Sequence, residues 1–181
     1  RLLKSPAKQR GRDFGVILAC FRDEGYTVEW RVINAAEYGY QQRSRRTFIF
    51  AYKDTTKYAN QVISNVGYKI NLSEEDKSES MEKIILQKGF FAETFPVNKV
   101  DSSKMHTKVL PKEVGEVSEI FQCSFENSGI MKDGIIYTLK TVPNYRGKQI
   151  TLGDVMETGE VDEQYFIPEE KLYYTDPEVT H

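Results

Sequence analysis

The sequence predicts an α/β fold over residues 1–53 and a mixed α+β region over residues 54–181. Two observations predict the first part: an apolar stripe at helical spacing and, directly after it, two runs of strand-forming residues. The second part is predicted by a capped amphipathic helix that precedes short β-like runs separated by turn signals. The 181 residues are enough for one or two small domains with a hydrophobic core.

The first predicted element is a helix from Asp13 to Glu24. Asp13 is a favourable N-cap residue, and Gly25 is a natural C-terminal stop. The apolar residues between them recur at intervals of three or four and form one stripe along the helix, made of Phe14, Ile17, Leu18 and Phe21.

Two predicted strands follow this helix. Residues Tyr26–Ile33 alternate between apolar and polar side chains, which is the two-residue period of a strand. Residues Thr47–Tyr52 are β-formers except for Ala51, so we expect this strand to be covered on both faces. We expect the two strands to pair antiparallel, with the helix packed on their sheet. Their connection, residues 34–46, is long and polar, and such loops often carry function.

The second part of the chain carries weaker signals. Ser73 to Asp76 has the capping-box pattern of a helix start, and Gly89 would end that helix. The remaining predicted elements are a short helix at 58–63, a β-like run at 121–125, turns at 127–129 and 133–134, and a returning strand at 135–142.

Composition excludes several classes of protein. Hydrophobic residues make up 39% and charged residues 29% of the chain, values near globular averages that argue against wholesale disorder. No apolar run approaches the length of a membrane span, and no signal peptide opens the chain. Two distant cysteines cannot build a disulfide framework or a zinc site, so we expect a cytoplasmic protein without a metal. Because Arg1 is not an initiator residue, we expect a processed or truncated chain, or a natural subunit.

The net charge of −2 hides an asymmetry along the chain. Residues 1–53 carry 11 Lys+Arg and 5 Asp+Glu, whereas residues 54–181 carry 14 and 22. A basic segment joined to an acidic one fits local contact with nucleic acid, and it fits ordinary charge scatter in a soluble protein about equally well.

Apart from the arginines, few side chains are candidates for a catalytic or binding role. His106 and His181 lie in polar or terminal context, and we expect both to be solvated. We expect Cys20 and Cys123 to be structural thiols of the core. No glycine-rich turn joins a strand to a helix, so no site for a cofactor phosphate or adenosyl group is visible in the sequence.

The arginine cluster before the second strand is the strongest candidate. Arg43, Arg45 and Arg46 precede a strand whose interior would not accept an unpaired charge. Solvation is a sufficient explanation for Arg43 and Arg45, whereas Arg46 adjoins the strand and is expected to be buried or partnered. A guanidinium there presents a planar fork of donors suited to a carboxylate, a phosphate or a base carbonyl.

Residues 30–52, WRVINAAEYGYQQRSRRTFIFAY, resemble one block of the cytosine-5 DNA methyltransferases. In that family a strand, a turn of the type Asn-Ala-x-x-Tyr-Gly-x-Pro-Gln and an x-Arg-x-Arg pair precede a buried strand. Residues 1–25 also resemble the segment that follows the family's Glu-Asn-Val motif. The resemblance covers residues 1–53 and is positional only beyond them.

The family's Gln-x-Arg-x-Arg motif lies at the catalytic pocket. Matched to it, the glutamine is Gln42, the first arginine position is Ser44 and the second is Arg46. The resemblance implies that Arg46 is catalytic and contacts the extruded cytosine, and that the preceding residues, Gln42 to Arg45, lie against DNA. The proline that precedes the glutamine is absent here, and Ser44 removes one arginine unless Arg43 or Arg45 compensates.

The resemblance implies the terminal strands and helix of a class I S-adenosylmethionine-dependent methyltransferase sheet, followed by a target recognition region. Residues 1–53 would be the C-terminal portion of the catalytic domain, and residues 54–181 would bind DNA. The parent enzyme would methylate carbon 5 of cytosine in duplex DNA, using S-adenosylmethionine, in bacterial restriction-modification. The family's cofactor loop, Pro-Cys nucleophile and Glu-Asn-Val motif are absent from these residues. This part alone is therefore expected to be inactive without the rest of the chain or a partner subunit.

Sequence-specific contacts are expected from two turn-rich segments. They are the hairpin at residues 127–134 and the basic loop at residues 144–148. Amide and cationic side chains in such turns supply donors to base edges and phosphates, although a solvated loop explains the same pattern equally well. The expected DNA contacts are Asn127, Tyr145, Arg146 and Lys148.

Three alternatives stay open. The chain could be one subunit of a split methyltransferase, or it could act on RNA, where the same chemistry is used. It could also be a DNA-binding or scaffold module without catalytic descent. Intact Glu-Asn-Val and Pro-Cys motifs upstream in the gene would exclude this last alternative.

Overall fold

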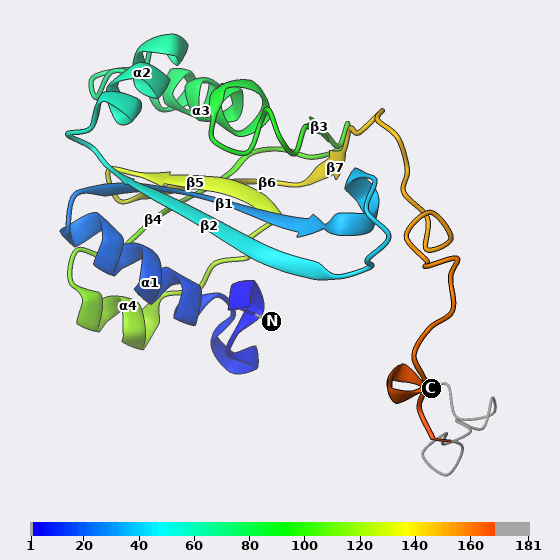
Figure 1. The fold of residues 1–181 in the computed structure, drawn as a ribbon. Helices are drawn as coiled ribbons and strands as arrows, with labels where there is room; N and C mark the ends of the chain where they lie inside the picture. The colour runs from blue at the N-terminus through cyan, green and yellow to red at the C-terminus, as the bar shows by residue number, and fades with distance from the viewer. Residues whose placement is uncertain (1, 169–181) are drawn as a thin grey trace. The chain divides into compact units, whose positions relative to one another are not determined.

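The computed structural model describes residues 2–168, which fall into two compact units that divide between Gln149 and Ile150. The first unit is a five-stranded sheet with helices on both faces (Figure 1). The second unit, in its described part, is largely irregular and exposed. Its one helical turn is the 3-10 helix η5 (Glu163–Tyr165), which begins after the capping carboxylate of Asp162.

The sheet of the first unit is antiparallel throughout and has the strand order β2-β1-β5-β6-β4. A smaller sheet pairs β3 with β7. The strands are β1 (Tyr26–Asn34), β2 (Arg45–Lys53), β3 (Val97–Lys99), β4 (His106–Val109), β5 (Ser128–Lys132), β6 (Ile135–Leu139) and β7 (Thr141–Pro143).

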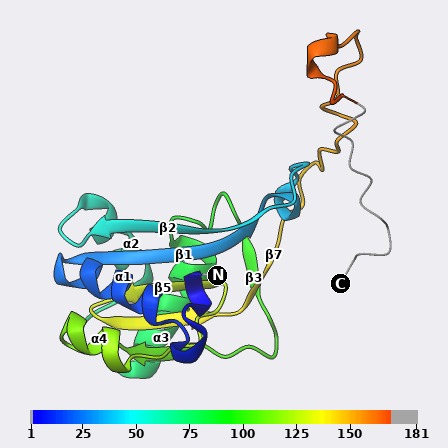
Figure 2. The ribbon, with the colours of Figure 1, turned by 90° about the horizontal axis from the view of Figure 1, so that it is seen from below.

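Strands β1 and β2 run side by side from end to end (Figure 2). The predicted antiparallel pairing of Tyr26–Ile33 with Thr47–Tyr52 is therefore confirmed. On its other edge β1 pairs with β5, so strands from both sides of residue 53 belong to one sheet. Residues on both sides of the boundary predicted at residue 53 belong to one compact unit. The functional part of that prediction, that residues 54–181 bind DNA, stays a prediction.

Helices α1 (Arg12–Asp23) and α4 (Val114–Ile120) cover one face of the sheet (Figure 1). The predicted helix Asp13–Glu24 is confirmed to within one residue at each end. Its N-cap is Gly11 and not Asp13, whose carboxylate in the first turn accepts a hydrogen bond from the Ser5 hydroxyl. The core on this face includes Phe14, Leu18, Val28, Trp30, Val117, Phe121, Met131 and Ile136.

Three helical segments cover the opposite face: α2 (Lys57–Val66), α3 (Glu74–Lys83) and the π-helix η4 (Ile84–Lys88). The predicted cap is confirmed, because the Ser73 hydroxyl accepts a hydrogen bond from a backbone N–H in the first turn of α3. The helical run also ends at Gly89 as predicted. The core on this face includes Val62, Met81, Ile84, Ile85, Ile130, Tyr137 and Leu139.

The prediction that Thr47–Tyr52 is covered on both faces is wrong. Strand β2 is the outermost strand of the sheet and has only β1 beside it in the described part of the chain. Phe48 and Ile49 are 47% and 38% exposed, although Tyr52 at the far end is buried. A run of β-formers fixes the strand, but burial depends on neighbours that other parts of the chain supply.

Two predictions for the third region also need correction. Asn127-Ser128-Gly129 is not a turn, since Ser128 and Gly129 begin β5 in the middle of the sheet. Residues 121–125 are extended but unpaired, and the helix before them, α4, was not predicted. The turn at Asp133-Gly134 is confirmed: both residues have positive φ, as a two-residue hairpin requires.

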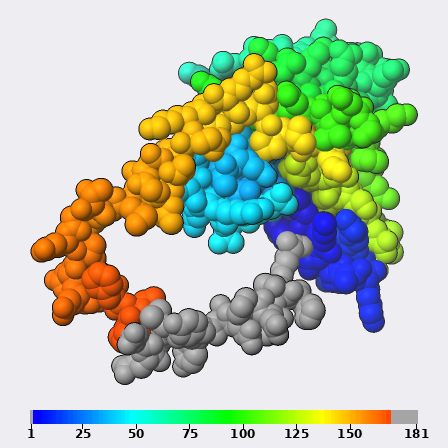
Figure 3. All heavy atoms as spheres, turned by 90° about the vertical axis from the view of Figure 1, so that its right-hand side faces the viewer, coloured from blue at the N-terminus to red at the C-terminus, as the bar shows by residue number. Residues whose placement is uncertain are grey.

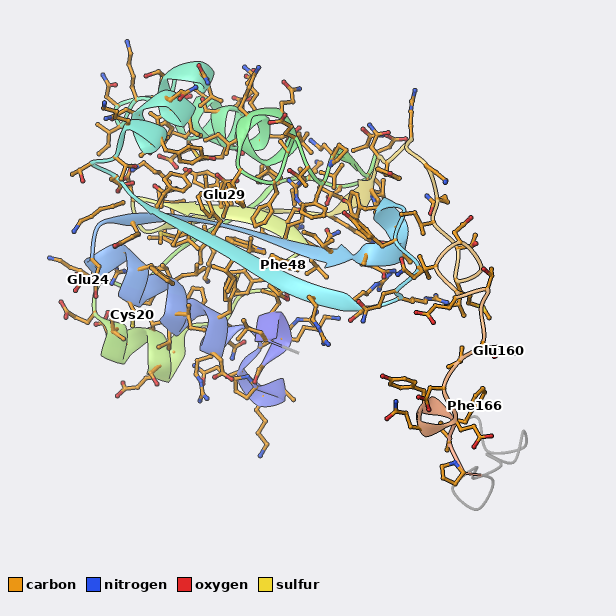
Figure 4. The ribbon with its side chains drawn as sticks, viewed as in Figure 1. Cys20, Glu24, Glu29, Phe48, Glu160 and Phe166 are labelled. Atoms are coloured by element: carbon orange, nitrogen blue, oxygen red, sulfur yellow. The ribbon has the colours of Figure 1, made fainter. Side chains whose placement is uncertain are left out.

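Two buried ionisable side chains of β1, Arg31 and Glu29, attach residues 85–95 to the sheet. Arg31, which is 2% exposed, donates to the backbone carbonyls of Ile85, Phe91 and Phe95. Two residues earlier, Glu29 points from β1 toward the helical layer and accepts the backbone N–H of Phe90 at 3.0 Å (Figure 4). Residues 85–95 are thus held against β1 by charge-assisted hydrogen bonds to their backbone.

Burial shifts the ionisation of both members of this pair. Loss of hydration raises the pKa of Glu29 to about 7, and the Phe90 amide and the Arg31 charge offset only part of that rise. Burial likewise lowers the pKa of Arg31 to about 10, which still leaves the guanidinium charged near neutral pH. Glu29 is therefore the group whose charge changes in the physiological range.

None of the helices in the described part of the chain is long and apolar enough to cross a membrane. Within residues 2–168, no three His, Cys, Asp or Glu side chains gather where they could hold a metal ion.

The raised pKa of Glu29 predicts a pH-dependent stability. The folded protein keeps this proton up to about pH 7, whereas the unfolded chain loses it near pH 4.5, so stability falls as the pH rises through that window. The loss is at most about 3.5 kcal/mol, since the pKa rises by about 2.5 and one pKa unit corresponds to about 1.4 kcal/mol. Glu29→Gln keeps an acceptor for the Phe90 N–H and does not titrate, so its stability should stay nearly flat from pH 5 to 8.

Urea unfolding midpoints at pH 5, 6, 7 and 8 test this expectation. Glu75→Gln, which changes an exposed carboxylate in the first turn of α3, is the matched control and should retain the wild-type slope. An equal slope in wild type and Glu29→Gln would show that Glu29 is not the titrating group.

Candidate functional site: a cavity beside the end of strands β1 and β2

The candidate site is a cavity of about 480 Å³ at the end of the sheet where β2 begins. It opens on the face of the sheet that carries Glu29 and Arg31, because Arg46 lies opposite Ile33 and Phe48 lies opposite Arg31 in the antiparallel register. The residues that line it are Ile33, Ala35, Tyr40, Gln42, Ser44, Arg46, Phe48 and Phe95.

The polar side chains of this cavity are spaced two residues apart. Gln42, Ser44 and Arg46 all line it, as expected when alternate residues of an extended chain face the same side. These are the three positions that the sequence matched to one motif. Arg43 and Arg45 are not among the lining residues, so the structure separates them from the other three.

Aromatic rings form the rim of the cavity. Tyr40 is 56% exposed, and Phe48 on β2 stacks against Phe95 with ring centroids 6.5 Å apart and an interplanar angle of 19°. Phe95 reaches this place because Arg31 holds its carbonyl. Flat apolar walls with a few polar groups between them suit a planar ligand that forms hydrogen bonds at its edge.

Arg46 is exposed, which corrects the expectation that burial or a partner would fix it. No hydrogen bond or ion pair of its side chain is found among residues 2–168. The reason is the edge position of β2, which leaves the start of this strand open to solvent. The guanidinium is therefore available to a ligand in the cavity.

A left-handed turn connects the cavity to the basic loop 144–148. The 3-10 helix η3 (Ala35–Tyr38) ends at Gly39 with φ of 89°, directly before Tyr40 on the cavity rim. The Tyr145 ring packs edge-on against Tyr38 at 6.1 Å, and its hydroxyl donates to the Lys148 carbonyl at 3.2 Å. A loop far along the chain is thereby held beside the cavity.

This packing also affects Tyr38 itself. Its hydroxyl donates to the Pro96 carbonyl at 3.3 Å, just after the segment that Arg31 holds. Burial raises the pKa of Tyr38, against the opposing effect of the Arg31 charge. The hydroxyl therefore stays protonated at neutral pH and joins the turn to residues 95–96.

The other predicted DNA contacts have different surroundings. Arg43, Arg146 and Lys148 are exposed, and Tyr145 is half-buried. Arg45 points to the opposite face of the sheet and forms a weak ion pair with Glu37 at 3.5 Å. The Asn127 side-chain amide already bonds within the protein: it donates to the Thr141 carbonyl and accepts from the Thr141 N–H, each at 2.8 Å. Its role as a DNA contact stays a prediction that this geometry does not favour.

The remaining candidates lie away from the cavity. His106 is exposed as expected, and His181 lies outside the residues that the structure describes. Cys123 is buried, which raises the pKa of its thiol to about 11. Cys20 is exposed on α1, so the expectation of a core thiol is wrong for this residue. Neither thiol faces the candidate site.

Sequence reasoning missed the aromatic part of the cavity. Tyr40 and Phe48 continue the two-residue spacing of Gln42, Ser44 and Arg46, and that alternation was a usable signal. Phe95 could not be found in this way, because only the folding of residues 85–95 onto β1 brings it to the site.

Comparisons with known proteins assign the sequence to a family. The model of the C-5 cytosine-specific DNA methylases matches residues 2–171. The type II methyltransferase M.Sau3AI of Staphylococcus aureus is 40% identical over 173 residues, which are 95% of this chain. The matched part is 38% of that relative, so the chain spans about two fifths of its length. No solved structure showed significant similarity.

The contact between the η3 turn and the loop 144–148 predicts that alanine substitutions at two glycines, Gly39 and Gly67, destabilise the protein to different extents. An alanine side chain at Gly39 would meet the Lys148 carbonyl and would lie 2.8 Å from the Tyr145 ring, whereas one at Gly67 meets nothing within 4 Å. Both residues have positive φ, so backbone strain contributes to both losses, and it contributes more at Gly39, where φ is 89°, than at Gly67, where φ is 68°. Gly39→Ala should therefore lose about 1–3 kcal/mol more stability than Gly67→Ala, through overpacking.

Urea unfolding of the two variants measures the difference. Equal losses would show that the loop does not pack against the turn, and the link between the loop and the cavity would be wrong.

Proposed function

The chain belongs to the C-5 cytosine-specific DNA methylase family, and from this premise we propose that it supplies the base pocket and DNA-recognition surface of an enzyme that methylates carbon 5 of cytosine in duplex DNA. The observation that carries the proposal is the common cavity of Gln42, Ser44 and Arg46. Similarity to a type II methyltransferase supports a role in bacterial restriction-modification. A protein whose substrate is bacterial duplex DNA would act in the cytoplasm.

The proposed ligand of the cavity is the extruded target cytosine. Carbon 5 cannot be reached inside the base stack, so the nucleotide must leave the duplex and enter a pocket. A volume of about 480 Å³ lies within the range of small-molecule sites. The rings of Tyr40, Phe48 and Phe95 would border the flat base, and the polar side chains between them would meet its edge.

Arg46 would act on the charge that develops in the base. Carbon 5 becomes reactive only after a thiolate adds to carbon 6, which moves negative charge onto the ring and its carbonyl. The Arg46 guanidinium would donate to that carbonyl and offset this charge as it forms. Gln42 and Ser44 would add neutral hydrogen bonds that orient the base.

Other parts of the enzyme would supply the nucleophile and the methyl donor. Cys20 lies on α1, on the other side of the sheet from Arg46, and the buried Cys123 thiol has a raised pKa. The described residues offer no glycine-rich strand-to-helix turn that fits S-adenosylmethionine, the donor that the family uses. We therefore propose that both come from elsewhere on the full-length chain or from a partner subunit, and that these residues alone do not methylate DNA.

The recognition surface would include the loop 144–148. Arg146 and Lys148 are exposed there, and Tyr145 fixes the loop against the turn that leads to the cavity. Cations at this place would hold phosphates close to the extruded base. We propose that residues 54–181 carry the sequence-reading part, with this loop as its contact nearest to the base pocket.

The first test is Arg46→Ala in the intact enzyme. Because the proposed contact matters mainly in the transition state, methyl transfer should fall far more than DNA affinity. Loss of one preorganised charged donor costs about 10²–10³ in rate. Arg43→Ala removes another exposed arginine, one outside the cavity, and should cost much less.

Single-turnover methylation of duplex DNA, with folding checked by circular dichroism, separates these cases. An unchanged single-turnover rate for Arg46→Ala, or an unfolded variant, would refute the catalytic role.

The second test concerns Lys148. A lysine that contacts phosphate adds about one unit to the slope of log affinity against log salt concentration. Lys148→Ala should therefore weaken binding to all DNA sequences and reduce the slope by about 1. Lys53→Ala, at an exposed lysine at the end of β2 far from the base pocket, is the control and should leave the slope unchanged. If Lys148→Ala also keeps the wild-type slope, Lys148 is not at the DNA interface.

A further inference from the structure

A second cavity of about 480 Å³ lies on the opposite face of the sheet from the base pocket. The alternation of β1 and β2 places it there, because Asn34 and Arg45 are cross-strand partners that point away from the face of Ile33 and Arg46. In Figure 3 the segments that form it meet on one surface: the blue start of the chain, the cyan start of β2 and the yellow segment near residue 140.

The bottom of this cavity holds an unsatisfied polar side chain. Asn34 is only 6% exposed, and its Oδ1 atom has no hydrogen-bond partner among the described residues. It stands at the N-cap of η3, a position where asparagine usually bonds to the helix backbone, yet its side chain makes no such bond. A buried amide oxygen that no protein group satisfies needs a donor from water or from a ligand, so Asn34 marks a place where a ligand can bind.

The walls and rim of the cavity have different chemistry. The walls are apolar, with Val32 and Phe125 beside Asn34. The rim carries three cations and two carboxylates. One carboxylate is engaged in the weak 3.5 Å pair with Arg45, whose side chain is 74% exposed. The rim residues are Lys4, Glu37, Arg45, Glu126 and Lys140.

We propose that this cavity binds one nucleotide of the DNA substrate, separate from the extruded cytosine. The Asn34 amide, which offers an acceptor next to a donor, would form paired hydrogen bonds with a base edge. Phe125 and Val32 would contact the base, and Lys4 and Lys140 would hold its phosphate. The identity of the nucleic acid rests on the proposed function, whereas the site itself rests on the unsatisfied amide and the three cations of its rim.

The two pockets share one structural element. The segment from Ala35 to Ser44 joins β1 to β2 and contributes lining residues to both: Glu37 to this cavity, and Tyr40 and Gln42 to the base pocket. A DNA strand across this end of the sheet would therefore contact the two faces at different nucleotides. The inferred role of the second pocket is to read or hold a base near the target.

Two substitutions separate base contact from phosphate contact. Asn34→Leu removes the amide, so it should weaken DNA binding about tenfold and abolish discrimination at one base position while the salt slope stays unchanged. Its thermal midpoint should be equal to or above that of the wild type, because an unpaired buried polar group is removed. Lys140→Ala should instead lower the salt slope by about 1 without changing base preference.

The experiment uses the full-length protein and fluorescence anisotropy on a duplex, with each base pair near the target cytosine replaced in turn. Lys53→Ala, at an exposed lysine at the far end of β2, is the control and should match the wild type. Thermal unfolding of every variant is measured in parallel.

The outcomes are distinct. Wild-type affinity and base preference in both Asn34→Leu and Lys140→Ala overturn this inference while the proposed function stands. Lowered thermal stability with unchanged DNA binding would show that another part of the protein fills the cavity, and this also overturns the inference. A wild-type protein that neither binds nor methylates cytosine-containing duplexes would instead contradict the proposed function.

Discussion

The arrangement of the candidate site depends on one buried cation. Arg31 donates to the backbone carbonyls of Ile85, Phe91 and Phe95, in a segment that no strand pairing attaches to the sheet. Its charge is retained in a desolvated place because these carbonyls replace water and Glu29 lies two residues away on the same strand. Without this interaction, residues 85–95 would keep only their apolar contacts with the sheet, such as the stacking of Phe90 on Phe50, and the position of the aromatic wall that Phe95 forms would no longer be fixed.

The two-residue period of the strands distributes the polar groups between two sites. Within β2, neighbours in sequence face opposite sides, so adjacent residues such as Arg45 and Arg46 serve different cavities. A cluster of arginines in sequence is therefore not a cluster in space. This is also why a single substitution in the segment can affect one face of the sheet and leave the other intact.

Local patterns predicted local structure well. The helix at α1, the pairing of β1 with β2, the cap at Ser73 and the turn at Asp133-Gly134 each follow from residues within a few positions of one another. The exposure of β2 and the central place of β5 did not follow, because both depend on which strands pair across long separations. The site divides in the same way: Gln42, Ser44 and Arg46 were expected from the resemblance to the family motif, whereas Phe95 and the second cavity at Asn34 require the folded chain.

The serine at position 44 stands where the resemblance places the first arginine of the motif, and the structure limits how that loss could be compensated. Arg45 lies opposite Asn34 and lines the other cavity, so it would have to leave β2 to reach the base pocket. Arg43 is exposed and does not line the pocket. Within the described residues, the pocket therefore contains one guanidinium, that of Arg46, beside the neutral groups of Gln42 and Ser44. A single cation can meet one developing charge on the base, which leaves the neighbouring phosphates to cations outside the cavity, such as those of the loop that Tyr145 holds against the η3 turn.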